Sequence, residues 1–265
     1  MKKKIVLFDL DGTLTPPRGS IDDETAQYVL GILHDTGARV GIVTGSDLPY
    51  VVQQLGGWTS KLGEAGLEVF SCNGTKHFLY RNGEWIQHTK FHEMREVLGP
   101  DMWRQLVTTL HNSQLRVMRE HPDIPLTGNF ISYRGSTLNW CPIGRDASEP
   151  DRQEFERLDH SRHIRILAKD WLTDCLDLQM PGKVQVVLGG NTSFDIFVKG
   201  WDKTYVLKIL DGVECWFVGD RCQEGGNDHT LYRALKVHGR AYETLGPGHT
   251  RKIIEEITKR ITDPC

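Results

Sequence analysis

The chain has 265 residues, of which 38% are hydrophobic and 25% are charged. This composition is ordinary for a globular protein and too apolar for general disorder, and the length allows one large domain or two modest ones. The net charge of −3 gives no reason to expect a nucleic acid or a membrane as a partner. No apolar run approaches the ~20 residues of a membrane span or forms a secretory leader after Met1, so we expect a cytoplasmic protein.

The first part of the chain predicts strands that alternate with helices. The first apolar run ends at Asp9 and holds no polar residue, which indicates a strand buried on both faces of a parallel sheet. The helical stretch that follows can be capped by Asp22 or Asp23 and ends at Gly37. The runs that predict strands are 5–8, 40–43 and 67–72. This β-α-β order is typical of a doubly wound α/β sheet.

Antiparallel pairing replaces this order in the middle of the chain. Arg81-Asn82-Gly83 separates two strand-like segments and predicts a hairpin, and Gly135-Ser136 predicts a second one. Long stretches at 91–110 and 150–178 are mostly helical in pattern, and 184 begins a new series of strands.

A strand over 214–219, a glycine-rich loop and a helix then restore the first pattern, and a last helix ends near Ile261. We therefore predict a Rossmann-like, doubly wound parallel-sheet core with an inserted α+β cap domain. The core would comprise residues 1–82 and 190–265, and the cap residues 83–189.

The segment Asp9-Leu10-Asp11-Gly12-Thr13-Leu14-Thr15 follows the first strand directly. Open parallel sheets bind ligands at the carboxyl ends of their strands, so both carboxylates would face that edge. Asp9 is a candidate nucleophile, because an aspartyl phosphate divides one difficult displacement into two easier ones. Asp11 is a candidate general acid and base. The same oxygen atoms suit a hard cation such as Mg²⁺.

This heptad resembles the first motif of the haloacid dehalogenase superfamily of phosphotransferases. The resemblance implies that Thr44 and Ser46 offer hydroxyl groups to a phosphate, and that Lys203 balances the charge of Asp9. It also implies that the carboxylates at the end of the strand 214–219 and in the loop after it hold Mg²⁺. The implied metal ligands are Asp9, Asp11, Asp220, Asn227 and Asp228.

The segments 133–145 and 189–203 resemble the eukaryotic-type phosphomannomutases, members of this superfamily with a type IIB cap. Three arginines of the predicted cap can converge on one anion, since guanidinium groups match phosphate geometry. The resemblance assigns Ser193 and Asp195 to phosphate and sugar hydroxyls, and Arg18 to the substrate when the domains close. The three arginines are Arg134, Arg145 and Arg152.

The resemblance implies a phosphomannomutase that interconverts mannose 6-phosphate and mannose 1-phosphate. Such an enzyme needs Mg²⁺ and a hexose 1,6-bisphosphate as activator, and the family forms homodimers through the cap. The alternative is a sugar-phosphate phosphatase that uses Asp9 in the same way with water as the acceptor. The family can carry a second, structural cation with an acidic ligand where this chain has Ala234, so we do not expect that site here.

Overall fold

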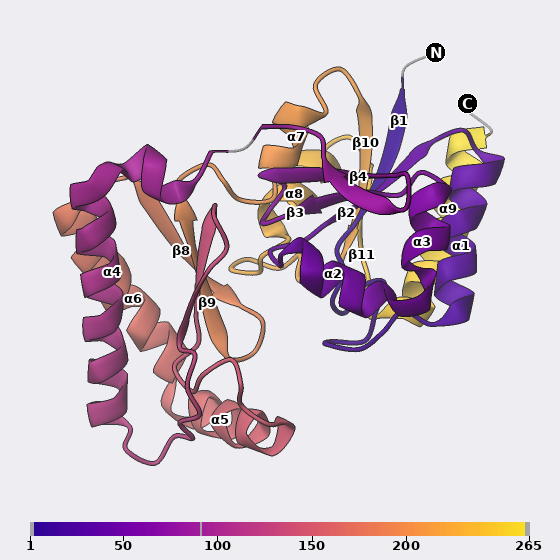
Figure 1. Cartoon of the computed structure of the whole chain (residues 1–265). Coiled ribbons are helices and arrows are strands. Elements are labelled where there is room, and N and C mark those ends of the chain that lie inside the picture. The colour runs from indigo at the N-terminus through magenta and orange to yellow at the C-terminus, as the bar shows by residue number, and fades with distance from the viewer. Residues whose placement is uncertain (1–2, 91, 263–265) are drawn as a thin grey trace. The chain divides into compact units, whose positions relative to one another are not determined.

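The computed structural model describes residues 3–90 and 92–262, which fall into two compact units (Figure 1). The first unit, the core, joins 1–91 to 201–265, and the second, the cap, spans 92–200. The predicted boundaries at 82 and 190 are corrected by strand pairing. Strand β5 (Glu84–Gln87) pairs with β4 in the core sheet, and β9 (Ser193–Val198) pairs on both sides within the cap sheet.

The core contains a seven-stranded sheet in the order β11-β10-β1-β2-β3-β4-β5. The first five strands are parallel and the last two antiparallel, because the β3–β4 and β4–β5 connections are short hairpins. The strands not yet given bounds are β1 (Lys4–Phe8), β2 (Arg39–Val43), β3 (Glu68–Ser71), β4 (Lys76–Arg81), β10 (Glu214–Gly219) and β11 (Ala241–Glu243).

Helices cover both faces of the core sheet, which confirms the doubly wound prediction. Val6 and Phe8 face one layer of helices, whereas Ile5 and Leu7 face the other, and all four side chains are fully buried. The first layer comprises α1 (Asp23–Asp35), α2 (Leu48–Leu55), α3 (Thr59–Glu64) and α9 (Pro247–Thr262). The second comprises α7 (Tyr205–Ile209) and α8 (His229–Lys236).

Strand β1 lies between β2 and β10 in the sheet. The chain leaves β1 towards β2 and returns later through β10 on the other side, so the carboxyl end of β1 lies at the point where the strand order reverses. Asp9, Thr44 and Asp220 each follow directly after one of these three strands. Parallel sheets bind their ligands at such a point.

The cap contains a four-stranded antiparallel sheet in the order β6-β7-β9-β8. Two of its helices, α4 and α6, pack against each other and appear side by side in Figure 1. The elements not yet given bounds are β6 (Ile131–Tyr133), β7 (Thr137–Trp140), β8 (Val184–Gly189), α4 (Met94–Glu120), α5 (Glu149–Arg162) and α6 (Ile164–Gln179).

Two cap helices differ from the prediction. Helix α4 continues ten residues beyond the predicted end at 110 and is kinked at Gly99, which has φ +74° and precedes Pro100. Its predicted start, Phe91, lies outside the described residues. The predicted helical stretch 150–178 is two helices, because His163 between them has φ +56°. The α5–α6 turn therefore changes the chain direction at a single left-handed residue.

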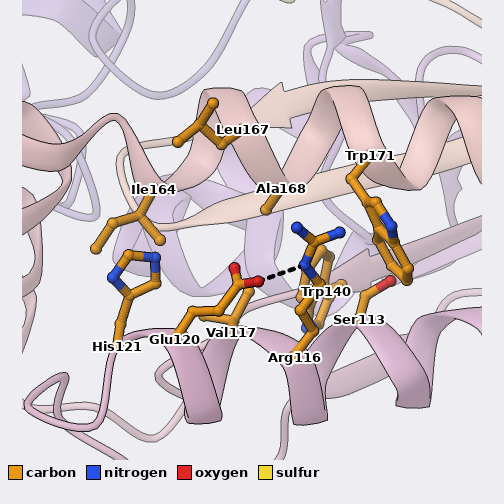
Figure 2. A pocket seen from close by; sticks show the side chains of 10 residues that line it. All are labelled: Ser113, Arg116, Val117, Glu120, His121, Trp140, Ile164, Leu167, Ala168 and Trp171. Carbon is orange, nitrogen blue, oxygen red and sulfur yellow. Dashed lines mark hydrogen bonds and ion pairs between the residues drawn. The ribbon is translucent and has the colours of Figure 1, made fainter.

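Figure 2 shows a small cavity between α4 and α6. Its volume is about 30 Å³, and its walls include Trp140 and Trp171. This volume holds about one water molecule, so it is too small for a sugar phosphate. No helix in the described part of the chain combines the length and apolarity that a membrane span requires.

Candidate active site

Asp9 and Lys203 form a buried ion pair at the carboxyl end of β1. Lys203 Nζ donates to Asp9 Oδ1 and to Asp228 Oδ1, each at 2.5 Å. All three side chains are at most 4% exposed. Lys203 precedes α7 and Asp228 precedes α8, so the ammonium group joins both helices of this layer to the strand that carries the candidate nucleophile.

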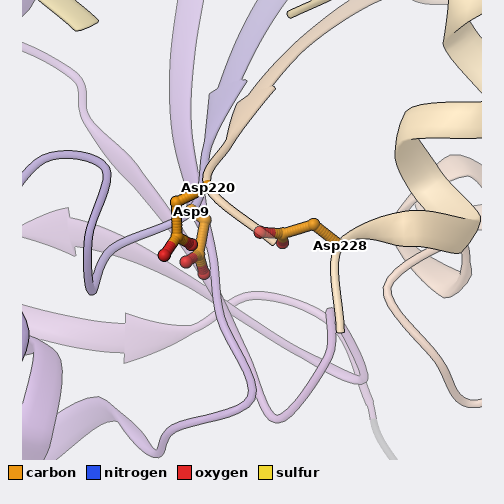
Figure 3. A group of neighbouring side chains, drawn as sticks. All are labelled: Asp9, Asp220 and Asp228. Carbon is orange, nitrogen blue, oxygen red and sulfur yellow. The ribbon is translucent and has the colours of Figure 1, made fainter. Parts of the chain in front are cut away.

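Asp220 completes a group of three carboxylates with Asp9 and Asp228 (Figure 3). One oxygen of each lies within 4.8 Å of the others. Lys203 and Arg221, which lies 3.9 Å from Asp220 Oδ2, are the cations beside these three carboxylates, so a formal surplus of one negative charge remains when all are ionised. Buried charge of this kind is costly unless a positive group balances it, so the arrangement suits one divalent cation.

Burial and the neighbouring charges shift the pKa values of this group. Burial, with Asp228 beside it, raises the pKa of Asp9 above its ordinary value, although Lys203 opposes this. Burial raises the pKa of Asp220 to about 6, and Asp228 adds to the rise. Burial would lower the pKa of Lys203, but Asp228 and Asp9 together raise it above its ordinary value. Lys203 is therefore a permanent cation.

Two buried oxygen atoms indicate where the cation would bind. Asp220 Oδ1 and Asn227 Oδ1 are buried and have no hydrogen-bond partner among the described residues. Asp228 differs, since Lys203 occupies its Oδ1 and the Arg221 backbone N–H donates to its Oδ2 at 3.0 Å. The predicted ligands Asp9, Asp220 and Asn227 thus fit Mg²⁺, whereas Asp228 chiefly holds Lys203.

Asp11 lies outside this group of three carboxylates, and its predicted role as a metal ligand stays a prediction. Its Oδ1 accepts from the Arg18 backbone N–H at 2.7 Å, from Gln54 Nε2 at 2.8 Å and from Tyr50 Oη at 3.0 Å. All three donors reach the same oxygen. This leaves Oδ2 as the oxygen that can carry an exchangeable proton, as a general acid and base requires.

Arg18 serves this arrangement through its backbone. It has φ +59°, and its exposed side chain does not belong to the network around Asp11 in the described residues. The predicted contact of the Arg18 guanidinium group with substrate stays a prediction.

Thr44 and Ser46 form the start of the loop after β2. Thr44 is buried, and its Oγ1 accepts from the Ser46 backbone N–H at 3.1 Å. Its backbone is fixed by hydrogen bonds with Phe70 and Asn73. Because Thr44 Oγ1 acts as an acceptor in this bond, its own proton stays available for another acceptor. The predicted contacts of Thr44 and Ser46 with a phosphate stay predictions.

In the cap, Asn139 on β7 joins several of the predicted substrate residues. Its amide group donates to Asp195 Oδ1 at 2.8 Å and to Ser193 Oγ at 3.2 Å. Its carbonyl oxygen accepts from Arg145 at 2.6 Å, and Arg134 lies 3.8 Å from Asp195 Oδ1. The β7–β9 register places Asn139 opposite Asp195, which explains the contact.

Arg152 has a structural role that the sequence did not indicate. Its guanidinium group donates to the backbone carbonyls of Ala147 at 3.1 Å and Arg145 at 2.7 Å, and to Thr192 Oγ1 at 2.8 Å. It is 6% exposed. Arg152 therefore holds the loop that carries Arg145. The predicted direct contact of Arg152 with phosphate stays a prediction.

Hydrogen bonds connect four of the five predicted cap residues through Asn139, Thr192 and the Arg145 backbone, and Arg134 joins them through its ion pair with Asp195. The three arginines against Asp195 leave a formal surplus of two positive charges, which matches a phosphate dianion. Sequence reasoning missed Asn139, Gln54 and Tyr50. Tyr50 and Gln54 lie four residues apart on α2 and therefore share a face, but only the fold shows that this face meets Asp11.

Solved structures with a similar fold include an IMP-nucleotidase and a trehalose-6-phosphate phosphatase. An IMP-nucleotidase of Plasmodium falciparum, truncated at its N-terminus and bound to IMP, has a TM-score of 0.66 with 14% identity, covering 97% of this chain and 68% of that one. A trehalose-6-phosphate phosphatase of Aspergillus fumigatus has a TM-score of 0.54 with 16% identity, covering 97% and 93%. At such identities the likeness establishes the haloacid dehalogenase fold alone.

Comparison of the amino-acid sequences identifies the family, which the likeness to solved structures does not. A phosphomannomutase of Dendrobium officinale is 37% identical over 238 residues, or 89% of this chain and 87% of the relative. One of Encephalitozoon cuniculi is 33% identical over 264 residues, or 98% of this chain and 95% of the relative, which includes the region of Asp9. The eukaryotic phosphomannomutase family model matches residues 31–260. The chain belongs to the eukaryotic phosphomannomutase family.

Proposed function

We propose that this chain is a phosphomannomutase that interconverts mannose 6-phosphate and mannose 1-phosphate through a phosphorylated Asp9. The observation that carries the proposal is the pairing of Asp9 with Lys203 at 2.5 Å within a carboxylate group that suits Mg²⁺, in a chain of this family. The family match favours the mutase over the phosphatase alternative, because the phosphatases resemble this chain only in fold.

In the first half of the proposed reaction, an Asp9 oxygen attacks one phosphorus of a hexose 1,6-bisphosphate. The bond from that phosphorus to the sugar oxygen breaks, and Asp11 gives its proton to the leaving oxygen. In the second half, ionised Asp11 takes the proton of a hydroxyl group on the hexose monophosphate. The hydroxyl oxygen attacks the phosphorus on Asp9, and the Asp9 carboxylate is restored.

The other core residues balance charge during these steps. Lys203 stabilises the negative charge of the transferring phosphoryl group, and Thr44 donates to one of its oxygens. Asp9, Asp220 and Asn227 would hold Mg²⁺, which supplies further charge neutralisation when bound. In the cap, the network around Asn139 would bind the phosphate that is not reacting, in either orientation of the sugar.

Trapping the phosphoenzyme tests this proposal. The protein is incubated with Mg²⁺ and glucose 1,6-bisphosphate, quenched in acid and analysed by intact and peptide mass spectrometry. We expect one added phosphoryl group on the peptide that contains Asp9, and none in an Asp9→Asn variant. Asp35→Asn, an exposed aspartate of the core, is the matched control and should be phosphorylated normally. Phosphorylation of Asp9→Asn would refute the assignment of the nucleophile.

We further propose that the chain forms a homodimer through the cap. Apolar side chains on α4 and α6 support this, since Leu115, Leu167 and Leu178 are 47%, 60% and 86% exposed. Light scattering in solution should report two chains per particle, and a Leu167→Glu variant should report one. The cytoplasmic location and the expected absence of nucleic-acid and membrane partners stay predictions.

A further inference from the structure

The turn between β8 and β9 leads directly into Ser193, a residue of the proposed cap site. Ser193 Oγ donates to the Gly189 carbonyl at 2.7 Å and accepts from Asn139 at 3.2 Å. Thr192 Oγ1 accepts from Arg152 at 2.8 Å. These contacts hold the end of the turn that leads into β9, so the position of Ser193 depends on how the whole turn is fixed.

A second arginine holds the other part of this turn. Arg165, in the first turn of α6, donates from one terminal nitrogen to the Gly190 carbonyl at 3.0 Å. Its Nε donates to Asp159 Oδ2 at 2.7 Å, and its backbone N–H donates to Asp159 Oδ1 at 2.7 Å. The two side chains are 15% and 12% exposed. Such a charged pair, largely withdrawn from water, fixes the direction of the guanidinium group.

Asp159 and Arg152 lie seven residues apart on α5, which is about two helical turns, so they share one face of that helix. Arg152 connects this face to Thr192 directly, and Asp159 connects it to Gly190 through Arg165. The turn is therefore attached to α5 at two points. Loss of the Asp159–Arg165 link would leave the Gly190 side of the turn with one attachment fewer.

We propose that Asp159 and Arg165 are positioning residues for substrate binding in the cap. They fix the turn 189–193, so that Ser193 and the Arg152-bound Thr192 keep the geometry that a sugar phosphate requires. This inference rests on the proposed function, because it takes a hexose phosphate as the ligand of the Asn139 network. Neither residue contacts the reacting atoms, so both act through the turn.

An Arg165→Met variant tests the inference, because methionine removes the two guanidinium contacts, to Asp159 Oδ2 and the Gly190 carbonyl, while keeping an unbranched apolar chain and the backbone N–H that donates to Asp159 Oδ1. We expect the KM for mannose 1-phosphate to rise about tenfold with kcat changed by less than about twofold, since binding common to ground and transition states is lost. Arg165→Lys should recover part of the loss. Arg162→Met is the matched control. Arg162 is the last residue of α5, and it pairs with exposed Asp123 through hydrogen bonds of 2.7 and 2.8 Å. Its side chain is 41% exposed.

Direct binding separates this inference from the proposed function. In an Asp9→Asn background, calorimetric titration with mannose 1-phosphate should show a Kd about tenfold higher when Arg165→Met is added. That result supports the positioning role even if the parent chain shows no mutase activity. Unchanged KM and Kd would overturn the inference. So would a lower melting temperature with reduced kcat and unchanged KM, because the pair would then only stabilise the α5–α6 junction.

Discussion

Replacing Lys203 by methionine is the sharpest perturbation of the core site. Lys203 is 1% exposed and donates to two buried carboxylates at 2.5 Å. Methionine fills a similar volume without the charge, so the variant keeps the packing between α7, α8 and β1. What it loses is the cation that balances Asp9 and Asp228.

The expected loss of stability follows from the burial of the pair. Breaking a buried ion pair by removing one partner costs about 3–5 kcal/mol, because the remaining charge is left uncompensated. In a chain of this size, each kcal/mol of lost stability lowers Tm by roughly 2–4 °C, so the whole loss should lower Tm by roughly 6–20 °C.

The loss should also depend on pH. In the parent chain the pKa of Lys203 is raised, so the stability that it contributes is complete throughout pH 5–8. In the variant, the pKa of Asp9, already raised by burial and Asp228, rises further without Lys203. When the pKa of a carboxylate is higher in the folded than in the unfolded state, the folded protein becomes less stable as the pH rises through the folded-state pKa. The deficit should therefore be smaller at pH 5 than at pH 8.

Scanning calorimetry at pH 5 and pH 8 without Mg²⁺ measures both effects. Lys208→Met is the matched control, because this exposed lysine lies five residues further along and its loss changes the net charge equally. A Lys203→Met variant as stable as the control at pH 8 would show that Lys203 does not balance the buried charge of Asp9 and Asp228. So would a deficit that grows as the pH falls.

Three further predictions concern the same core. Because the pKa of Asp220 is raised to about 6, protons compete with Mg²⁺ there, and the rise in Tm on adding Mg²⁺ should be full at pH 8 and decline below about pH 6. In a Gly12→Ala variant, Mg²⁺ should no longer raise the Tm at pH 8. Gly12 has φ +76°, and the new methyl group would lie 2.3 Å from Asp220 Oδ2. An unchanged rise in Tm would show that the methyl group does not displace Asp220. Gln54→Leu removes the 2.8 Å hydrogen bond to Asp11 and the 2.7 Å hydrogen bond that Gln54 Oε1 accepts from Thr15. Loss of the bond to the charged Asp11 should lower kcat by about tenfold, whereas loss of the bond to Thr15 should chiefly lower stability. An unchanged kcat in steady-state assays would show that Gln54 does not position Asp11.

Much of the core could be predicted from the sequence because its signals are local. The unbroken apolar run before Asp9 predicted β1, and the chain order then placed Asp9, Thr44 and Asp220 at the same edge of the sheet. The cap boundaries were wrong because a hairpin signal does not show which sheet the hairpin joins. Strand β5 pairs with core strand β4, and β9 with cap strands on both sides.

The details of the site depended on contacts distant in sequence. Gln54 lies 43 residues from Asp11, and no spacing pattern shows that their side chains meet. Arg152 has the residue type and position of a phosphate ligand, yet its donors reach backbone carbonyls and Thr192. Residue types predicted which groups gather in each unit. They could not predict which hydrogen bonds each group makes, since these depend on strand register and helix packing.

The most direct test of the proposed function is to follow mannose 1-phosphate by phosphorus NMR in the presence of Mg²⁺ and a trace of mannose 1,6-bisphosphate. We expect the signal of mannose 1-phosphate to be replaced by that of mannose 6-phosphate, with little inorganic phosphate, and we expect Asp9→Asn to abolish the conversion. Release of inorganic phosphate as the main product, or conversion that persists in Asp9→Asn, would contradict the proposed function.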